Sequence, residues 1–423
     1  MRGVRVLAAG LAVGLSCGLT ACGNSQAPVT PVDPGPASAA SCTVAEVGAE
    51  LDALPKAEMI RVRQKFFGTA AVDPDTGALP ADRVIASWVA VTTYAVSLNG
   101  HVVLFDAFIG DASGYVPTDD CELTDLRPEA VFVGHGHNDH ARLLATVANR
   151  NRGVPVYSSE EVCIDLELAL SGVTAANCTA VLPAAAPLGS SARFPGTLPG
   201  IDLEVVRLTH SAATEPQNPG DPSVIVPVPV YAKPADAGPC FGSQEGDYPP
   251  NGLTCPPLES PDSLPYSYTQ DGLVSVLFQF QMPNDLNLTW FNSFGPTDTG
   301  DDILTALEAL PQTDIQLGSI LGLNGTFNGF LDVRVGTEAL RSRLVVPGHH
   351  DYLPRVRGLT FEAAYAEETD RTPAASRPGI VFMSDPEHYL VPERLSWSSD
   401  DPAWQQTTPL PGLPSGSSAL PAP

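Results

Sequence analysis

The chain has 423 residues, of which 43% are hydrophobic, so it is long enough to bury a large core. Its 48 acidic residues outnumber its 22 basic residues and give a formal net charge of −26 at pH 7. A chain this acidic, with no run of Lys and Arg, should repel polyanions, so nucleic acid is not expected as a partner.

The N-terminal segment has the pattern of an export signal. Arg2 and Arg5 precede an apolar stretch that is too short to span a membrane. The sequence LTAC at residues 19–22 follows, and it resembles the bacterial lipobox, in which cleavage precedes a lipid-modified cysteine. We therefore predict a lipoprotein signal peptide over residues 1–22, with Cys22 as the lipidation site. Ordinary cleavage beside a chance cysteine is the alternative.

Lipid chains on Cys22 would anchor an exported protein to a bacterial membrane, on the periplasmic or cell-surface side. Residues 23–41 are rich in Pro, Ala, Ser and Gly, which predicts a flexible linker. Residues 401–423 carry repeated Pro and Ser and are predicted to be a disordered tail. The folded domain is therefore expected over residues 42–400.

Cysteine use agrees with an exported protein. Six cysteines remain after Cys17 in the signal segment and Cys22, and an even number in an exported chain indicates disulfides. Free buried thiols or a zinc site are the alternatives, but no Cys-x-x-Cys spacing supports a metal. Six cysteines allow fifteen pairings. Proximity favours the pairs Cys163–Cys178 and Cys240–Cys255, which leaves Cys42 for Cys121.

The first clear structural signal is a β-hairpin. Two β-rich runs, 92–98 and 101–106, are joined by Asn99-Gly100, which tolerates the positive φ angles of a type I′ turn. A short apolar strand over 130–133 then leads directly into the sequence HGHNDH at 135–140. Apolar residues at helical spacing follow from 141 to 148. The predicted order is strand, His-rich loop, helix.

A second strand, 203–208, leads into His210. Residues from about 212 to 268 are crowded with Pro and Gly and contain Cys240 and Cys255, so we expect a disulfide-stapled insertion there, or alternatively a small separate domain. No internal repeat of fixed period is visible. The later predicted elements are strands over 273–280 and 286–291, a helix over 302–310, and a strand over 344–346 that ends in PGHHD.

The His-rich loop carries the strongest chemical signal. Three of the chain's eight histidines, His135, His137 and His140, lie within six residues of one another, together with Asp139. Imidazole and carboxylate groups are ligands of Zn²⁺ and similar divalent metals. A His-rich turn on the surface is the alternative, but two further histidines also follow predicted strands.

The sequence HGHNDH resembles the His-x-His-x-Asp-His signature of the metallo-β-lactamase-like superfamily. The hairpin ending in Asp106 precedes it, and His210 and His349 follow it, in the order that superfamily shows. The resemblance covers roughly residues 85 to 355. It implies an α/β fold of the metallo-β-lactamase type, an αββα sandwich, in which loops after several strands converge on a metal site at one edge.

The resemblance also implies a cofactor and a reaction. The cofactor would be one or two zinc ions, with iron or manganese as alternative metals. The reaction would be hydrolysis of a small-molecule substrate, an ester, lactone, amide or phosphoester, by a metal-bound hydroxide. Asp139 would be the catalytic residue that orients this group and takes up a proton. The implied ligands are His135, His137 and His210 for one ion, and Asp139, His140 and His349 for the other.

Three neighbouring residues receive supporting roles. The resemblance makes Asp106 a structural residue that holds the backbone of the metal loop. His349 and His350 compete for one ligand position, and we prefer His349 because it directly follows Pro-Gly at the strand end. His350 or Asp351 is then expected outside the ligand set or as a donor to the leaving group. Asp139 could also cap the helix expected from residue 141.

The chain departs from the family pattern at one point. The superfamily usually supplies a bridging aspartate after a later strand, and here Asn292 or Ser293 stands at that position as a bridging or supporting residue. An amide or hydroxyl oxygen brings no negative charge to offset two nearby cations. Asp298, Asp301 or Asp302 is the alternative source of this acid, although all three lie beyond the expected position. A catalytically reduced lipoprotein that keeps the fold to bind a metal or ligand is therefore an alternative function. An oxygen- or thiol-handling di-iron protein of the superfamily is a third, which an oxidising location disfavours.

Overall fold

The computed structural model describes residues 56–109, 116–118, 120–169, 177–210, 214–216, 225–227, 268–269, 272–295, 301–320, 330–351, 358–383 and 387–400. The predicted signal peptide with Cys22, the linker and the tail lie outside these ranges, as does most of the predicted insertion with Cys240 and Cys255. None of the helices in these ranges is both long and apolar enough to cross a membrane.

The first of two mixed sheets has seven strands in the order β17-β1-β2-β3-β4-β5-β6. Strands β17 to β3 pair antiparallel, and strands β3 to β6 pair parallel. The predicted hairpin is confirmed as β2 and β3, with positive φ angles at Asn99 and Gly100 in its turn. The strands are β1 (Arg83–Ala90), β2 (Thr93–Leu98), β3 (His101–Phe105), β4 (Ala130–Phe132), β5 (Pro155–Ser158), β6 (Asn177–Ala180) and β17 (Ser396–Ser398).

The second sheet runs β16-β15-β14-β13-β12-β8-β7, with β11 (Tyr268–Thr269) paired to β12. Strands β7, β8, β12 and β13 pair antiparallel, and strands β13 to β16 pair parallel. A separate ribbon joins β9 (Thr214–Pro216) and β10 (Ile225–Pro227). The remaining strands are β7 (Ser191–Leu198), β8 (Ile201–Thr209), β12 (Gly272–Gln281), β13 (Asn287–Phe291), β14 (Ile315–Ser319), β15 (Leu344–Gly348) and β16 (Gly379–Ile380).

The two sheets pack face to face over an aromatic core. Phe105 of the first sheet stacks on Phe280 and Trp290 of the second, with ring centroids 5.2 and 4.9 Å apart. Successive residues of a strand point to opposite faces, so in β1 Trp88 enters this inner core and Val89 enters an outer one. Both faces of each sheet are therefore buried, which explains the long apolar runs in the sequence.

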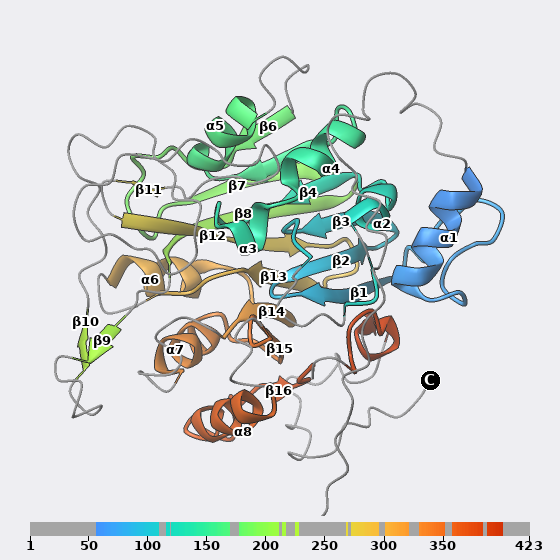
Figure 1. Cartoon of the computed structure of the whole chain (residues 1–423). Coiled ribbons are helices and arrows are strands. Elements are labelled where there is room, and N and C mark those ends of the chain that lie inside the picture. The colour runs from blue at the N-terminus through green and yellow to red at the C-terminus, as the bar shows by residue number, and fades with distance from the viewer. Residues whose placement is uncertain are drawn as a thin grey trace, which may run out of the picture. The chain divides into compact units, whose positions relative to one another are not determined.

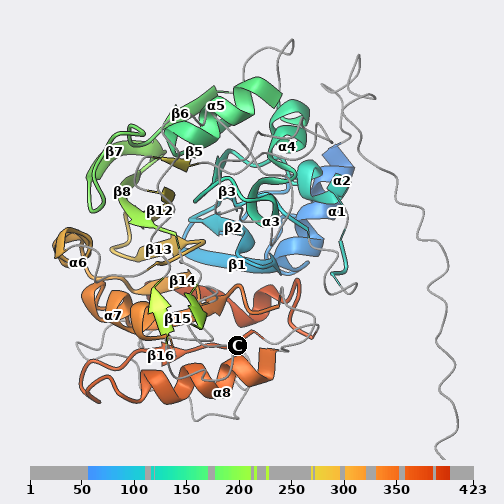
Figure 2. The same ribbon diagram turned by 60° about the vertical axis from the view of Figure 1, so that its left-hand side comes forward.

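Helices cover the two outer faces (Figures 1 and 2). Over the first sheet lie α1 (Lys56–Phe67), α2 (Asp120–Asp125), α4 (Leu144–Arg150) and α5 (Glu160–Ala169). Over the second lie α6 (Asp301–Ala309), α7 (Leu331–Ala339) and α8 (Gly358–Thr369). A 3₁₀ helix, Pro392–Arg394, precedes β17. The predicted α/β class is confirmed, with two mixed sheets between helical layers.

The disulfide prediction is confirmed where the structure describes it. Cys163 in α5 is bonded to Cys178 in β6, with the two Cα atoms 5.5 Å apart. The bridge ties the outer helix to the edge strand that it covers. Cys121 in α2 is also disulfide-bonded.

Both sheets repeat one pattern of strand directions. Antiparallel strands β1-β2-β3 are followed by parallel β4, β5 and β6, and antiparallel strands β8-β12-β13 are followed by parallel β14, β15 and β16. Asp106 directly follows β3, and Asn292 directly follows β13. These two residues therefore occupy equivalent places in the two halves, although no repeat is visible in the sequence.

Candidate metal centre

Loops that follow β4, β8 and β15 bring all six predicted ligands into two groups. Within each group, one nitrogen or oxygen atom from each residue lies within 4.8 Å of the corresponding atoms of the other two. The groups are His135, His137 and His210, and Asp139, His140 and His349. Their members match the two sets that the sequence resemblance implied.

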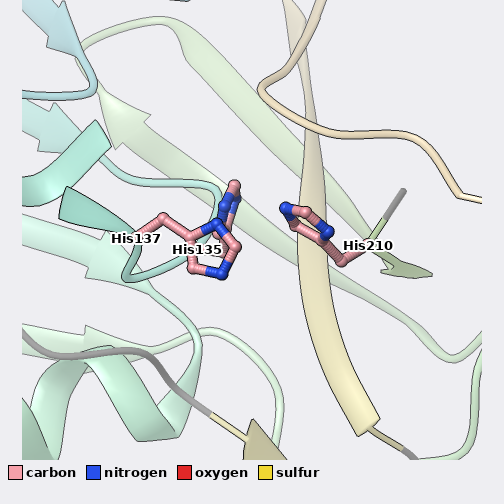
Figure 3. A group of neighbouring side chains, drawn as sticks. All are labelled: His135, His137 and His210. Atoms are coloured by element: carbon pink, nitrogen blue, oxygen red, sulfur yellow. The ribbon is translucent and has the colours of Figure 1, made fainter. Parts of the chain in front are cut away.

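The first group joins the two sheets. His135 and His137 come from the loop after β4, and His210 comes from the end of β8 in the other sheet (Figure 3). The ring of His135 lies 4.4 Å from that of His137 and 4.5 Å from that of His210, measured between centroids. His135 is fully buried, and His137 is 5% exposed. Three imidazoles therefore converge on one small volume.

The second group is built around a carboxylate. Asp139 Oδ2 lies 3.2 Å from His349 Nε2 and 3.5 Å from His140 Nε2. The rings of His140 and His349 are 5.0 Å apart between centroids. The two groups adjoin each other, because the ring of His140 lies 4.3 Å from that of His135. The arrangement offers two neighbouring positions for cations.

The loop after β4 takes its shape from close packing. Gly134 lies against Asn292 so tightly that a Cβ atom would stand 2.1 Å from the Asn292 amide oxygen. The backbone amides of His140 and Ala141 both donate to the carbonyl of His137, which starts the short helix α3 (Asn138–Ala141). Asp139 therefore lies inside this turn, so the idea that it caps a helix beginning at residue 141 was wrong.

Asp106 supports the ligand loop through hydrogen bonds with His140 and Gly134. Its Oδ2 lies 2.8 Å from His140 Nδ1, and its Oδ1 accepts a hydrogen bond from the backbone amide of Gly134 at 3.4 Å. The hydroxyl of Thr92 donates to the same carboxylate at 2.8 Å and lies 2.9 Å from His140 Nδ1. Burial raises the pKa of Asp106, and His140 beside it acts in the opposite direction.

Asn292 forms the corresponding support for the first group. Its Oδ1 lies 2.8 Å from His135 Nδ1 and accepts a hydrogen bond from the Ser275 hydroxyl at 3.0 Å. Its Nδ2 donates to both carboxylate oxygens of Asp106, at 3.0 and 3.2 Å. Asn292 is therefore engaged with the residues behind the ligands. Ser293, beside it, is also buried.

Asp302, one of the three acids beyond the expected bridging position, belongs to neither ligand group. Asp302 is an exposed residue of α6. Asp298 and the side chain of Asp301 lie outside the described residues. Among the described carboxylates, only Asp139 belongs to either of the two groups.

The electrostatics of the site favour neutral imidazoles at His135 and His137 and an ionised carboxylate at Asp139. Burial lowers the pKa of His135 well below its usual value, and the neighbouring His140 lowers it further. Burial and His210 do the same to the pKa of His137. Burial acts to raise the pKa of Asp139, but His140 and His349 outweigh it, so the pKa falls. Neutral imidazole and ionised carboxylate are the forms that bind a metal.

The hydrogen bonds fit a metal ion as well. Because Asn292 Oδ1 can only accept, His135 Nδ1 carries the proton and Nε2 keeps its lone pair. That Nε2 atom is buried and has no hydrogen-bond partner among the described residues. Asp106 fixes His140 in the same way, with Nε2 toward Asp139. Ligand histidines in metal proteins typically donate their second N–H to such an acceptor.

A strained turn between β1 and β2 supports the site. Val91 has a φ of 54°, which is unusual for a β-branched residue, and its amide lies 3.1 Å from both carboxylate oxygens of Asp351. Its carbonyl accepts hydrogen bonds from the backbone of His349 at 2.8 Å and from the indole of Trp88 at 3.0 Å. The next residue is Thr92, so this turn sets the position of the hydroxyl beside His140.

His350 lies away from both ligand groups. Its ring is fully buried and packs 4.4 Å from the ring of Phe382 and 5.0 Å from that of Trp88. Burial lowers the pKa of His350 to about 3. Asp351 also accepts a hydrogen bond from the hydroxyl of Tyr389 at 2.7 Å. Donation to a leaving group by either residue stays a prediction.

Sequence reasoning did not single out Thr92, Ser275, Val91 or Tyr389. Thr92 was the first residue of the predicted hairpin, and Ser275 lay inside a predicted strand. The neighbouring sequence does not indicate the role of a hydroxyl in a β-rich run, because its hydrogen-bond partner comes from a distant segment of the chain. Only the predicted meeting of strand ends at one edge would have directed attention to them.

Comparisons with known proteins find similarity only among solved structures. No family model matches the chain, and no curated protein matches it. Igni18, a metallo hydrolase from the archaeon Ignicoccus hospitalis, is 15% identical with a TM-score of 0.43, over 71% of this chain and 95% of that one.

Two further solved structures match this chain with lower TM-scores. YhfI of Bacillus subtilis, described as a metallo-beta-lactamase fold protein, is 10% identical with a TM-score of 0.39, over 72% of this chain and 97% of that one. CmlA, a diiron beta-hydroxylase from Streptomyces venezuelae, is 14% identical with a TM-score of 0.31, over 64% of this chain and 46% of that one.

Proposed function

We propose that this chain is a metal-dependent hydrolase of a small ester, lactone, amide or phosphoester. The observation that carries the proposal is the pair of adjoining, largely buried His and Asp groups, each with its ligand atoms within 4.8 Å of one another. The first group would hold one divalent ion through three imidazoles, the donor set of many catalytic zinc sites. The second group would hold another ion. Zinc is the first metal to test, and iron and manganese are the alternatives.

A divalent ion in such a site acidifies a bound water molecule and stabilises negative charge on a carbonyl or phosphoryl oxygen. The chain's own contribution is positioning and proton transfer. Asn292 and Asp106 orient His135 and His140, so that each presents Nε2 to the site. Asp139, kept ionised by His140 and His349, is the proton acceptor in this proposal.

The charge of the chain narrows the substrate class. A net charge of −26 disfavours the approach of polyanions and, more weakly, of anionic phosphodiesters. Neutral esters, lactones and amides are therefore the first substrates to test. Phosphoesters remain in the panel because two adjoining cations would offset part of this charge locally.

Lipid anchoring at Cys22 is part of the proposal. The support is the sequence of residues 1–22, with its basic start, apolar stretch and LTAC ending. Metabolic labelling with a fatty acid should mark the wild-type protein in a membrane fraction, and Cys22→Ala should release unlabelled protein. Labelling that is unchanged in Cys22→Ala would contradict the anchor.

The test of the enzymatic proposal combines metal analysis with a hydrolysis panel. We expect purified protein to carry one or two equivalents of a transition metal and to hydrolyse at least one neutral substrate class. The double variant His135→Ala/His137→Ala should lose both metal and activity. His101→Gln, at a surface histidine outside both groups, is the matched control and should keep both. A wild-type protein without bound metal, or a double variant with unchanged hydrolysis, would rule the proposal out.

One observation supports a second candidate, a lipoprotein that binds a metal or ligand without turnover. Asn292 or Ser293 stands at the sequence position where the resemblance expects a bridging aspartate, and neither an amide nor a hydroxyl brings negative charge to a pair of cations. In that case zinc titration of metal-free protein would show a tight site, while the full ester, lactone, phosphodiester and β-lactam panel would show no hydrolysis. A di-iron content with oxygen-dependent chemistry would instead indicate the third alternative.

A further inference from the structure

The side chain of Asn292 uses both ends of its amide. Its Oδ1 receives hydrogen bonds from His135 Nδ1 and from the Ser275 hydroxyl, which occupy the two acceptor positions of a carbonyl oxygen. Its Nδ2 donates to both oxygens of Asp106. The reverse orientation of the amide would face two oxygens toward each other at Asp106, so the network fixes the orientation.

This amide connects the two ligand groups through Asp106, which belongs to neither group. His135 belongs to the first group and His140 to the second, and each donates its Nδ1 proton to a buried acceptor. The two acceptors, Asn292 and Asp106, are themselves hydrogen-bonded at 3.0 Å. A continuous path therefore runs from His135 through Asn292 and Asp106 to His140. A shift of any member displaces the ligand nitrogen of the next.

The packing of Gly134 shows that Asn292 is closely confined. The missing side chain of Gly134 makes room for the Asn292 amide, since a Cβ atom there would overlap Oδ1 at 2.1 Å. Asn292 is itself fully buried. An amide with filled acceptor positions and this little space is not poised to swing into the site as a ligand.

We propose that Asn292 is a positioning residue that couples the orientation of His135 to that of His140, and that it does not replace a bridging carboxylate. This inference rests on the proposed metal-dependent function. It replaces the hypothesis that Asn292 is an uncharged substitute for a metal-bridging aspartate. An amide at position 292 donates hydrogen bonds to the Asp106 carboxylate, which an ionised carboxylate at the same position could not do.

The substitution Asn292→Asp separates the two roles. If residue 292 were a ligand, an introduced carboxylate would strengthen metal binding by adding negative charge. If Asn292 is a positioning residue, the same change places two buried carboxylates within about 3 Å with no donor between them, which disrupts the support of both groups. The two readings predict opposite changes in affinity.

The experiment is a cobalt titration of metal-free protein, followed by the visible absorption of bound Co²⁺. We expect Asn292→Asp and Asn292→Ala to weaken binding of both ions by roughly 10- to 100-fold, the range seen for partners behind metal ligands, and to alter the absorption bands. Asn149→Asp is the matched control, because Asn149 in α4 is also a buried amide but belongs to neither group. It should keep the wild-type spectrum and affinity, whatever its effect on stability.

The exchange variant Asp106→Asn/Asn292→Asp tests the coupling directly. It places an amide at position 106 and a carboxylate at position 292, so that a donor again faces an acceptor. We therefore expect it to bind Co²⁺ more tightly than either single variant. The exchange variant also keeps the proposal testable if the single variant Asn292→Asp folds poorly.

Each outcome has a distinct meaning. Tighter binding or an additional ion in Asn292→Asp would overturn the inference, as would wild-type affinity in both single variants. An exchange variant that regains thermal stability without regaining Co²⁺ affinity would show a merely structural role and would also overturn it. Failure of the wild-type protein to bind Co²⁺ would instead refute the proposed metal-dependent function.

Discussion

Asp351 receives the backbone amide of Val91 on both of its carboxylate oxygens, each at 3.1 Å. These residues are 260 positions apart in the chain and follow strands of different sheets, β1 and β15. The contact holds Val91 at a φ of 54°, where a β-branched residue is strained. The same turn positions Thr92, whose hydroxyl lies 2.9 Å from His140 Nδ1.

Replacing Asp351 with Asn should release this turn. The amide keeps one acceptor oxygen but loses the charge that strengthens the bond to the Val91 amide. We expect a loss of about 1–3 kcal/mol in the free energy of unfolding, measured by urea denaturation of metal-free protein. Asp400→Asn, at an exposed acid, is the control. Equal stability of Asp351→Asn and wild type would contradict the role given to this contact.

Adding a methyl group at Gly134 should damage the site through Asn292. The new Cβ would stand 2.1 Å from Oδ1 of the fully buried Asn292 amide, so the amide or the loop would have to shift. Overpacking of this kind costs about 1–3 kcal/mol of stability, and we expect a loss of metal affinity with it. Gly196→Ala serves as the comparison, because Gly196 also resists substitution through its φ of 66° but has no atom within 4 Å of the new Cβ. It should lower stability modestly and leave metal binding unchanged.

Removal of metal should lower the thermal midpoint of the protein. An ion that binds only the folded state adds RT ln(1 + [L]/Kd), about 4 kcal/mol when free metal exceeds Kd a thousandfold. We expect a chelator to lower the midpoint in calorimetry by several degrees. His210→Ala should reduce this difference, because it takes the second sheet's ligand from the first group. A midpoint insensitive to chelator in the wild type would be inconsistent with a bound ion.

His350 should make the metal-free protein sensitive to acid. Burial lowers its pKa from 6.5 to about 3, so between these pH values the unfolded chain binds a proton that the folded chain does not. The stabilising contribution is complete above pH 6.5 and is lost as the pH falls toward 3, at about 1.4 kcal/mol per pH unit. In His350→Phe, we expect the fall in stability between pH 6.5 and 4.5 to be shallower by up to that amount. The two proteins should show parallel pH dependence above pH 7.

Sequence patterns predicted the elements that carry the site. The Asn99-Gly100 turn, the strand before His135 and the strand before His349 all have strong local signals, and the structure contains them. The structure contains the helix expected after the His-rich loop as α4 (Leu144–Arg150), and a break separates it from the short helix α3 within that loop. The break occurs because the backbone amide of Leu143 donates to the carbonyl of Ala107 instead of continuing the first helix.

Several elements escaped the sequence reasoning for a physical reason. Strand β14 (Ile315–Ser319) is only five residues long and contains Gly318, so its sequence gives a weak strand signal although all five residues are buried. Helix α5 carries Glu161, whose partner Arg207 comes from a distant strand. Such contacts decide the structure but leave no periodic trace nearby. The same holds for the hydrogen bonds of Asn292, which link segments 157 and 186 residues apart.

The repeated strand pattern of the two sheets has a consequence for folding kinetics. His135 belongs to the first half, whereas His210 and His349 belong to the second, so neither half alone can present a complete set of ligands. An ion can bind tightly only after the two sheets have docked, late on the folding pathway. Interactions formed after the rate-limiting step slow unfolding without accelerating folding. Metal should therefore lengthen the lifetime of the folded protein while leaving its refolding rate nearly unchanged.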